Sequence, residues 1–297
     1  MTTARPRGFA PWRPQSKTQP LLDQVLAVLD TYRDSLPLTG RQIFYRLVAT
    51  IDYPKEESSY KSLLELINRA RRAQIIPMDS IRDDGAKVEG NDRYSDKAEF
   101  LENVMDWARD FPLDLQQYQP LHLVLVCEAQ GMMPQLMRVA RPFGVPVRSS
   151  GGFDSTTVKH ELGKYCAEQN KPVRIIHVGD LDPSGEHIHL SLGEDVAAFA
   201  SHYGGEEVDV VRCAVTAEQQ AIYDLPTAPP KKTDKRSFAH SFTVQAEALP
   251  PDTLAEIVRQ ALEENTDLYE LNHARDLQAE AREELVSRLG EILDQFG

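Results

Sequence analysis

The chain has 297 residues, with 33 Lys and Arg against 46 Asp and Glu, a formal net charge of −13 and a hydrophobic fraction of 41%. This composition supports sizeable cores and excludes a wholly disordered chain, and no apolar run approaches the roughly 20 residues of a membrane-spanning helix. The N-terminal residues lack the pattern of a secretory signal, and three scattered cysteines are too few for a disulfide framework or a zinc site. We therefore expect a soluble, cytoplasmic protein of about two domains.

Charge is distributed unevenly along the chain. Residues 1–87 carry a net charge of +4, whereas residues 88–297 carry −17. The change falls at residues 85–93, GAKVEGNDR, whose Gly, Asn and Asp are typical of a loop. The acidic balance argues against a passive nucleic-acid coat, because duplex binding depends on Lys and Arg at the phosphates. A domain boundary is predicted near residue 88.

The part before this boundary is predicted to be helical. Apolar residues recur there at helical spacing in three segments joined by short links. The segments are residues 20–34, residues 40–51 capped by Thr39, and residues 60–76 capped by Ser58 or Ser59 and stopped by Pro77. Such an arrangement is typical of a helix-turn-helix or winged-helix domain, which we place at residues 20–87 after a disordered basic tail at residues 1–19.

Two groups of basic residues are candidates for contacts with DNA. One lies on the third helix and the other in a Pro- and Lys-rich loop at residues 226–240. The groups are Lys61, Arg69, Arg71 and Arg72 in the helix, and Lys231, Lys232, Lys235 and Arg236 in the loop. The helix arginines fit an ordinary solvated helix face equally well.

Strands and helices alternate from residue 120 onward. The expected strands are residues 121–127, 146–148, 173–178 and 208–215, and the expected helices are residues 132–141, 155–168, 184–200, 251–264 and 267–296. This alternation indicates an α/β fold with a mostly parallel sheet covered on both sides. The sheet domain is placed at residues 120–225, a linker with a connecting helix at 88–119, and a basic loop with a helical extension at 226–297.

Three carboxylates follow two of these strands. Glu128 ends the first apolar strand, and Asp180 and Asp182 follow the 173–178 strand in GDLDPSG. Parallel sheets bind ligands at the carboxyl ends of their strands, and carboxylate oxygens suit Mg²⁺, which stabilises charge on a phosphodiester. Asp182 is equally explained as a helix cap, whereas Glu128 at the end of a buried strand is costly without a partner.

The strand–Glu and strand–DxDPxG pattern resembles the Toprim domain, the Mg²⁺-binding fold of topoisomerases, primases and related nucleases. The DPSG continuation is most similar to the A subunit of DNA topoisomerase VI, a type IIB topoisomerase, and to its relative that makes meiotic double-strand breaks. The later VQAEALPPDTLAEIV resembles the segment that follows Toprim in stand-alone bacterial members. The resemblance implies that Glu128, Asp180 and Asp182 hold Mg²⁺, which Mn²⁺ could replace.

The same family carries a nucleophilic tyrosine in a motif like R-[DE]-I-[FY]-Y, which corresponds here to RQIFY, from Arg41 to Tyr45. These two residues are four apart and share a helix face. A phenol with a pKa of about 10 is a weak nucleophile, and a nearby guanidinium would favour the phenolate. The resemblance implies that Tyr45 cleaves double-stranded DNA and forms a 5′-phosphotyrosyl link. It also implies a homodimer in which Tyr45 of one chain meets the acids of the other.

Three functions remain open on the sequence. The first is DNA cleavage by tyrosine transesterification, with Arg41 and Glu128 assisting Tyr45. The second is a metal-dependent nuclease in which water attacks and Tyr45 only packs, as aromatic residues on amphipathic helices most often do. The third is a DNA-binding or partner-binding protein without chemistry. The chain has no GxxxxGK[ST] motif, so strand passage would require a separate ATPase subunit. Any of these functions fits a nucleoid-associated protein.

Overall fold

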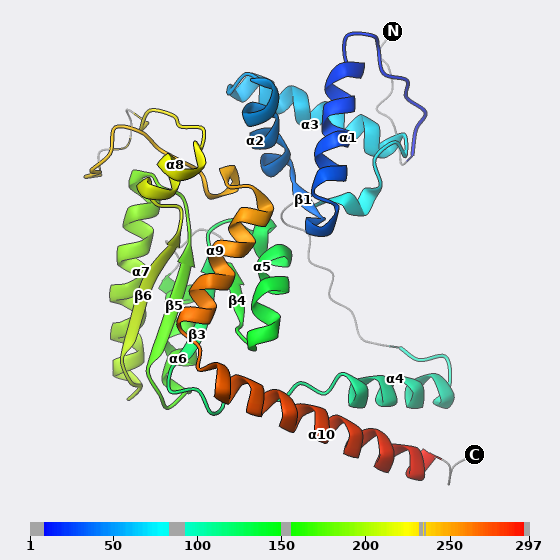
Figure 1. The fold of residues 1–297 in the computed structure, drawn as a ribbon, viewed down its shortest axis with the longest axis vertical. Helices are drawn as coiled ribbons and strands as arrows, with labels where there is room; N and C mark the ends of the chain where they lie inside the picture. The colour runs from blue at the N-terminus through cyan, green and yellow to red at the C-terminus, as the bar shows by residue number, and fades with distance from the viewer. Residues whose placement is uncertain (1–8, 83–92, 150–155, 232–233, 235, 294–297) are drawn as a thin grey trace.

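The computed structural model describes residues 9–82, 93–149, 156–231, 234 and 236–293, and these residues form a mixed α/β protein (Figure 1). Its helices are α1 (Gln19–Thr31), α2 (Gly40–Ile51), α3 (Glu57–Arg72), α4 (Lys97–Arg109), α5 (Met133–Ala140), α6 (Thr156–Ala167), α7 (Pro183–His202), α8 (Ala217–Tyr223), α9 (Pro251–Glu264) and α10 (Leu268–Leu293). Its strands are β1 (Leu38–Thr39), β2 (Ile81–Arg82), β3 (His122–Cys127), β4 (Val147–Ser149), β5 (Val173–Val178) and β6 (Val208–Ala214). The predicted helices and strands are present within a few residues of their expected bounds, and the short helix α8 and the two-residue strands β1 and β2 are additions.

The main sheet has the strand order β4-β3-β5-β6, and every neighbouring pair is parallel. The chain passes from β3 outward to β4 on one side and then returns to β5 on the other. Connections therefore run in opposite directions from β3, which makes the carboxyl ends of β3 and β5 a topological switch point. Open α/β sheets bind their ligands at such a point.

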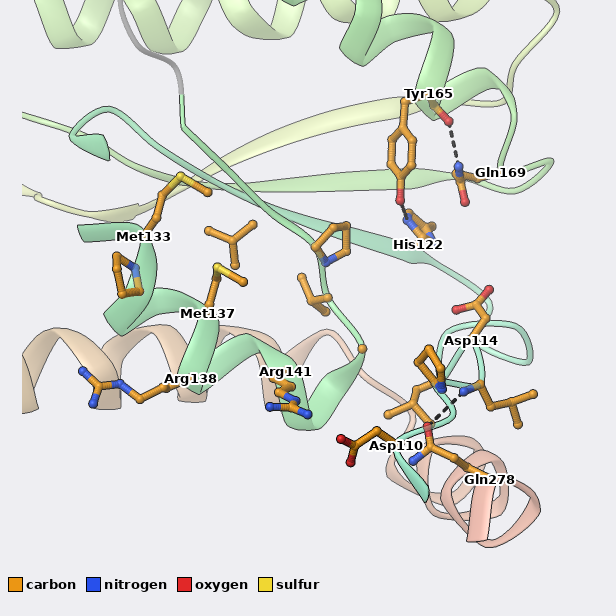
Figure 2. A pocket seen from close by; sticks show the side chains of 18 of the residues that line it. Asp110, Asp114, His122, Met133, Met137, Arg138, Arg141, Tyr165, Gln169 and Gln278 are labelled. Atoms are coloured by element: carbon orange, nitrogen blue, oxygen red, sulfur yellow. Dashed lines mark hydrogen bonds between the residues drawn. The ribbon is translucent and has the colours of Figure 1, made fainter. Parts of the chain in front are cut away.

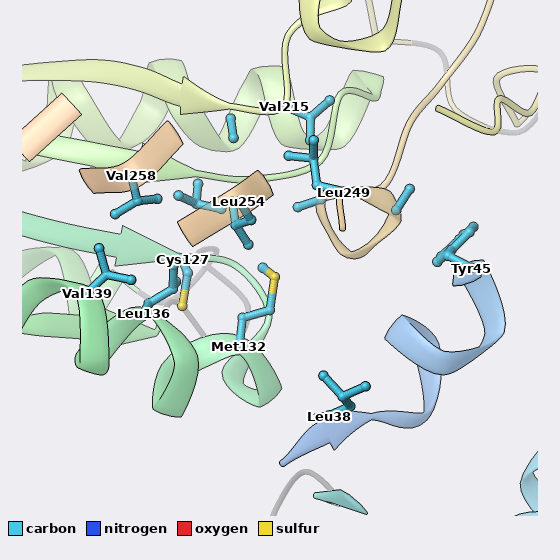
Figure 3. Close-up of a cluster of buried hydrophobic side chains, with 14 of the residues drawn as sticks. Leu38, Tyr45, Cys127, Met132, Leu136, Val139, Val215, Leu249, Leu254 and Val258 are labelled. Atoms are coloured by element: carbon cyan, nitrogen blue, oxygen red, sulfur yellow. The ribbon is translucent and has the colours of Figure 1, made fainter. Parts of the chain in front are cut away.

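Alternating residues of β3 fill two separate cores. Leu123, Leu125 and Cys127 face one side of the sheet, whereas Val124 and Val126 face the other, as the period of two in a strand requires. Helices α5 and α9 cover the first side with Leu136, Val139, Leu254 and Val258 (Figure 3), and α6 and α7 cover the second with Leu162, Cys166, Leu192 and Val196. The sheet is therefore covered on both faces, which explains why its central strand β3 is apolar from Leu123 to Cys127.

The N-terminal helices form a compact unit with a two-stranded parallel pair, β1 and β2. Helix α2 begins with a capping box: the Thr39 hydroxyl accepts from the Gln42 N–H at 3.1 Å, and the Gln42 side chain accepts from the Thr39 N–H at 2.8 Å. The expected serine cap of α3 is wrong, because Glu56 occupies that position and makes no side-chain cap. Residues 1–8 lie outside the described residues, whereas Trp12 packs against the core and is not part of a disordered tail.

Two elements extend the sheet domain. Helix α9 packs against α5 and β6 and is thus a layer of the sheet domain rather than a separate extension. Helix α10 packs against α4 at the end of the sheet remote from α2 (Figure 1). Most of the predicted boundary loop, residues 85–92, lies outside the described residues. Among the helices that the structure describes, none combines the length and apolar character needed to cross a bilayer.

Candidate metal and nucleophile site

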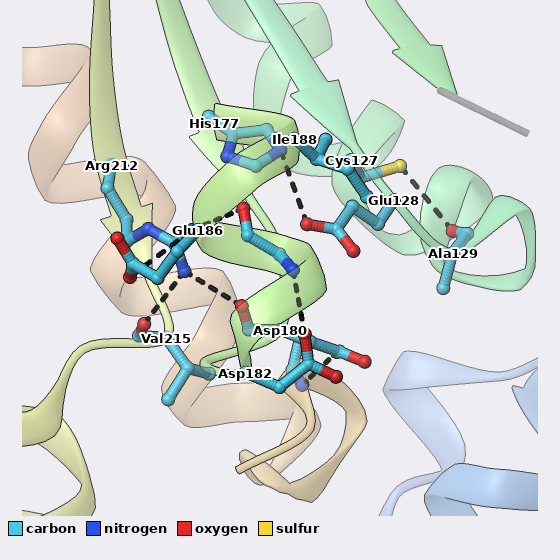
Figure 4. Close-up of polar contacts among 12 residues, drawn as sticks. Cys127, Glu128, Ala129, His177, Asp180, Asp182, Glu186, Ile188, Arg212 and Val215 are labelled. Carbon is cyan, nitrogen blue, oxygen red and sulfur yellow. Dashed lines mark hydrogen bonds and ion pairs between the residues drawn. The ribbon is translucent and has the colours of Figure 1, made fainter. Parts of the chain in front are cut away.

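The three predicted carboxylates lie at the switch point of the sheet (Figure 4). Strands β3 and β5 pair in register up to Cys127 and Val178, and the N–H of Glu128 donates to the carbonyl of Val178 at 3.0 Å. Glu128 and the loop from Asp180 to Asp182 therefore leave adjacent strands at the same edge. The sequence-based expectation that these acids share one region of the fold agrees with this geometry.

Each aspartate has one carboxylate oxygen engaged by the backbone. Asp180 Oδ1 accepts from the N–H of Ala246 at 2.8 Å, and Asp182 Oδ1 accepts from the N–H of Gly185 at 2.7 Å as the N-cap of α7. The capping role of Asp182 is thus real, and it leaves that residue's second oxygen for another ligand. Capping and ligand binding are compatible at Asp182.

The glycine before Asp180 lets the loop approach Glu128 closely. A Cβ added at Gly179 would lie 2.0 Å from Glu128 Oε1 and 2.6 Å from the His177 ring, so a larger residue would displace the carboxylate. His177 is fully buried, and its Nε2 lies 3.7 Å from Glu128 Oε1. Burial, Arg212 and His189 lower the pKa of His177 to about 3, so this contact joins a neutral imidazole to the carboxyl group rather than forming an ion pair.

Burial and mutual repulsion make the acids difficult to ionise together. Burial is the largest cause that raises the pKa of Glu128 to about 8, Asp180 and Asp182 add to it, and Arg212 opposes it. The pKa of Asp180 is also raised, mainly by burial, and the Ala246 N–H and Arg41 act against this. A cluster of this kind is stabilised when a cation lies beside it.

The donor chemistry fits a hard divalent cation, although the side chains are not gathered around one point. In the parts of the chain that the structure describes, no three His, Cys, Asp or Glu side chains are arranged to hold a metal ion. Mg²⁺ commonly takes only one or two carboxylates and completes its shell with water and phosphate. Glu128, Asp180 and Asp182 would supply such carboxylates, all from the sheet edge.

Arg212, a residue that our sequence analysis did not identify, holds the acidic loop at both ends. It lies on β6 with an 11% exposed side chain, and its Nη1 donates to the carbonyl of Asp180 and its Nη2 to the carbonyl of Gly185, both at 2.9 Å. Glu186 Oε1 lies 3.7 Å from Nη2. A charged residue within the apolar run VDVVRCAV was the available signal, because an arginine in a buried strand requires partners.

Replacing Arg212 by Met is expected to destabilise the fold by about 3 kcal/mol, because the loop carbonyls lose charge-assisted hydrogen bonds in a buried place. Urea unfolding at pH 7 measures the change. Arg174→Met on the neighbouring strand β5 is the matched control. Its side chain also bonds two partners, Asp209 and Asn265, but it is 35% exposed, so these contacts contribute about 1 kcal/mol. Equal losses in the two variants would contradict the role of Arg212.

Tyr45 and Arg41 donate hydrogen bonds to the same acceptor, the side-chain oxygen of Gln245. The Tyr45 hydroxyl donates to Gln245 Oε1 at 2.9 Å, and Arg41 Nη1 donates to the same oxygen at 3.0 Å. Arg41 Nε also lies 3.9 Å from Glu247 Oε2. The two residues therefore share a face of α2, as their spacing predicted, and that face is directed toward residues 245–247.

The segment from Val244 to Ala248 connects α2 to the acidic loop. On one side, Val244 pairs with Leu181 through two backbone hydrogen bonds, and the Ala246 N–H binds Asp180. On the other side, Gln245 accepts from Tyr45 of α2. The Thr39 hydroxyl, at the cap of α2, donates to Glu247, and Arg46 donates to the carbonyl of Ala248. Gln245, which binds Tyr45, is therefore next in sequence to Ala246, whose N–H binds Asp180.

Tyr45 and Asp182 line the same cavity within one chain. The cavity has a volume of about 390 Å³, and Lys55, Lys231 and Gln245 also border it. The resemblance to the topoisomerase VI A subunit implies that Tyr45 of one chain meets the acids of another chain. In this structure the tyrosine and an acid already face a common space inside a single chain.

Arg41 was expected to lower the pKa of Tyr45, but burial of the phenol raises this pKa by more than Arg41 lowers it. Burial raises the pKa of Tyr45 to about 12, Arg41 lowers it, and Asp180 and Glu247 raise it again. The guanidinium thus acts in the predicted direction, but desolvation of the phenolate is the larger effect. Tyr45 is protonated at neutral pH in this state.

Of the predicted DNA-binding residues that the structure describes, only Lys231 borders the Tyr45 cavity. On α3, Lys61 pairs with Glu57 at 3.4 Å and Arg69 pairs with Glu65, as in an ordinary solvated helix face. Arg71 donates to the carbonyl of Met78 at 2.9 Å, and Arg72 Nε donates to Asn68 at 3.2 Å. Of the loop residues, Lys231 lines the Tyr45 cavity, Arg236 pairs with Asp234 at 3.1 Å, and Lys232 and Lys235 lie outside the described residues.

A larger cavity, of about 840 Å³, lies near the amino end of the strands, where β3 begins at His122. Figure 2 shows Met133, Met137 and Arg138 of α5, and Arg141 directly after it, on one side of the cavity, and Asp110, Asp114 and Gln278 on another. Arg138 donates to the carbonyl of Asp34 at 3.0 Å. This cavity contains none of the predicted site residues.

No protein-family model matches the chain, and the search of curated proteins finds no matching sequence. The function is therefore inferred from the site itself.

Proposed function

We propose that the protein is a Mg²⁺-dependent DNA-cleaving enzyme of the Toprim class, similar to the A subunit of DNA topoisomerase VI, in which Tyr45 is the nucleophile. The observation that carries the proposal is the shared cavity of Tyr45 and Asp182 at the switch point of a parallel sheet. The N-terminal helices would serve as a winged-helix-like DNA-binding domain. The proposal thus joins a nucleophile from one unit to carboxylates from the other.

The chemistry assigned to the protein's residues is transesterification. The Tyr45 oxygen forms a bond to phosphorus, the bond from phosphorus to the 3′ oxygen breaks, and the phenol proton ends on that leaving oxygen. Arg41 stabilises negative charge on the phenol oxygen, and Gln245 orients the hydroxyl. Mg²⁺, held by Glu128, Asp180 and Asp182, would stabilise charge on the phosphate. One chain holds one Tyr45, so cutting both strands of a duplex requires two copies.

A metal-dependent nuclease that uses water is the second candidate. The observation that favours it is the buried, protonated phenol of Tyr45, whose pKa is raised to about 12. In this reading Tyr45 packs against Phe44, with ring centroids 5.4 Å apart, and only orders Gln245. The carboxylates would then be sufficient for activity in the presence of a metal ion.

Supercoiled plasmid incubated with the purified protein and Mg²⁺ or Mn²⁺ tests both candidates. Transesterification predicts nicked or linear DNA with protein bound to the 5′ ends, which is detected by protease-dependent mobility and by mass spectrometry of the linked peptide. Cleavage that leaves free ends would replace the first candidate with the second. An absence of cleavage with either metal, in a protein shown to be folded, would contradict both enzymatic functions.

A further inference from the structure

The space beside Tyr45 contains basic residues that the reaction scheme above does not use. The cavity of about 390 Å³ and an adjoining one of about 330 Å³ share Tyr45, Lys55, Lys231 and Gln245 in their walls. Arg41, which the scheme does use, borders the second cavity. Three cations from three separate parts of the chain therefore surround one tyrosine.

Lys55 is the best placed of these cations. Its Nζ lies 5.5 Å from the centroid of the Tyr45 ring and donates to the carbonyl of Pro226 at 2.9 Å. An ammonium group has three N–H donors, and this is the one hydrogen bond of Nζ found among the described residues. Burial lowers the pKa of Lys55, because its ammonium is partly removed from water, and an anion in the cavity would offset that loss.

The acids at the rim of these cavities are largely engaged with other groups. Glu57 pairs with Lys61 at 3.4 Å, and Asp234 pairs with Arg236 at 3.1 Å. Glu56, which also borders the second cavity, accepts from the Ser58 hydroxyl at 3.3 Å. Asp182 uses one oxygen to cap α7. Each of the four acids that border the two cavities therefore has a partner of its own, which reduces its repulsion of an anion held by Lys55 and Lys231.

We infer that Lys55 and Lys231 form a phosphate-binding pocket against Tyr45, built within one chain, which takes a phosphate group of a nucleic-acid strand. This inference rests on the proposed function for its nucleic-acid source, but phosphate binding itself is independent of cleavage. A lysine binds phosphate as a compact point charge with several donors, which suits a pocket of this size. The bound phosphate would lie between the phenol and Asp182.

Binding is measured in metal-free buffer of low ionic strength, by ¹H–¹⁵N NMR titration with inorganic phosphate, thymidine 5′-monophosphate and thymidine. We expect both phosphates to shift the amides of Ser184 and Gln245, and thymidine to leave them unchanged. Similar affinities for inorganic phosphate and thymidine 5′-monophosphate would show that the pocket recognises only the phosphate group. Tighter binding of the monophosphate would show an additional contact to the nucleoside. Shifts confined to the arginine-lined cavity beside α5 would overturn the inference.

Variants assign the binding to particular residues. Lys55→Gln is expected to weaken phosphate binding about tenfold and Lys231→Gln about threefold, since Lys231 is more exposed. Lys164→Gln, at an exposed position of α6, is the matched control and should remain within twofold of the wild type. Lys55→Arg keeps the charge and should preserve binding, which separates loss of a contact from loss of folding. Equal affinities for Lys55→Gln and Lys164→Gln would overturn the assignment.

Asp182→Asn is a second, opposite test. Asparagine also caps helices, so α7 is retained, while a negative charge beside the phosphate is removed. Phosphate should bind about threefold more tightly to this variant without metal, and unchanged or weaker binding would contradict the placement of the phosphate.

The outcomes distinguish this inference from the proposed function. Phosphate binding that depends on Lys55, in a wild-type protein that cleaves no DNA, would retain the pocket and reject the cleavage. Cleavage that depends on Tyr45 but not on Lys55, with no phosphate-induced shifts, would retain the function and reject the pocket.

Discussion

Tyr45→Phe is expected to abolish protein-linked DNA ends and to reduce plasmid cleavage by about a thousandfold or more, because no other hydroxyl takes the place of the nucleophile. The substitution removes one oxygen and keeps the ring packed on Phe44. The lost hydrogen bond to Gln245 should lower stability by only about 1 kcal/mol. Loss of activity in a folded variant would therefore report on chemistry.

Tyr53→Phe is the matched control for this experiment. The Tyr53 hydroxyl also makes one hydrogen bond, to the carbonyl of Ser59 at 3.1 Å, and its ring also packs on Phe44. It should cleave DNA at the wild-type rate. Cleavage that survives Tyr45→Phe but is lost in Asp180→Asn would establish the water-using nuclease instead, and an adduct on another residue would reject Tyr45.

Mixed dimers show whether the site is complete in one chain. Two copies, one carrying Tyr45→Phe and the other Asp180→Asn, are combined after separate purification. A site shared between chains would regain one intact centre and nick the plasmid, whereas a site within one chain regains none. The common cavity of Tyr45 and Asp182 predicts no recovery of nicking.

Glu128→Gln is expected to stabilise the metal-free protein increasingly as the pH rises. The pKa of Glu128 is about 8 in the fold, against 4.5 for the free side chain, so the folded state binds more protons than the unfolded state between these values. Stability linked to Glu128 is therefore complete below about pH 4.5 and is lost as the pH rises to about 8. Glutamine avoids this loss, with a gain on the order of 4 kcal/mol at pH 8 and none near pH 4.

Urea unfolding in EDTA at pH 4, 6 and 8 measures this gain. Glu168→Gln, at an exposed position after α6, is the control and should change stability by about 0.5 kcal/mol or less at each pH. Added Mg²⁺ should stabilise the wild type more than Glu128→Gln at pH 8, since a ligand that binds only the folded state raises its stability. An equal gain in unfolding free energy at pH 4 and pH 8 would show that folding does not raise the pKa of Glu128.

Local sequence patterns were sufficient to predict the elements and the position of the acids. The apolar runs of β3 and β5 identified buried strands, and the polar residues directly after them identified the edge where Glu128 and Asp180 lie. Thr39 similarly marked the start of α2. These features depend on neighbours within a few residues, so the sequence alone carries them.

The partners of the site residues depend on chain segments far apart in the sequence. Gln245 binds Tyr45 across 200 residues, and Arg212 holds the carbonyl of Asp180 across 32. Lys55 had no local signal, because it becomes part of a cavity only where the α2–α3 connection passes the loop after α8.

The sign of a pKa shift is likewise a tertiary property. The spacing of Arg41 and Tyr45 predicted an activated phenol, and their shared helix face is present. The predicted lowering of the Tyr45 pKa was wrong, because burial raises it. Burial depends on every segment packed around the phenol, and residue spacing does not describe those segments. The sequence therefore determined which chemical groups lie at the sheet edge, and the tertiary structure determined which of them are buried, charged and within reach of one another.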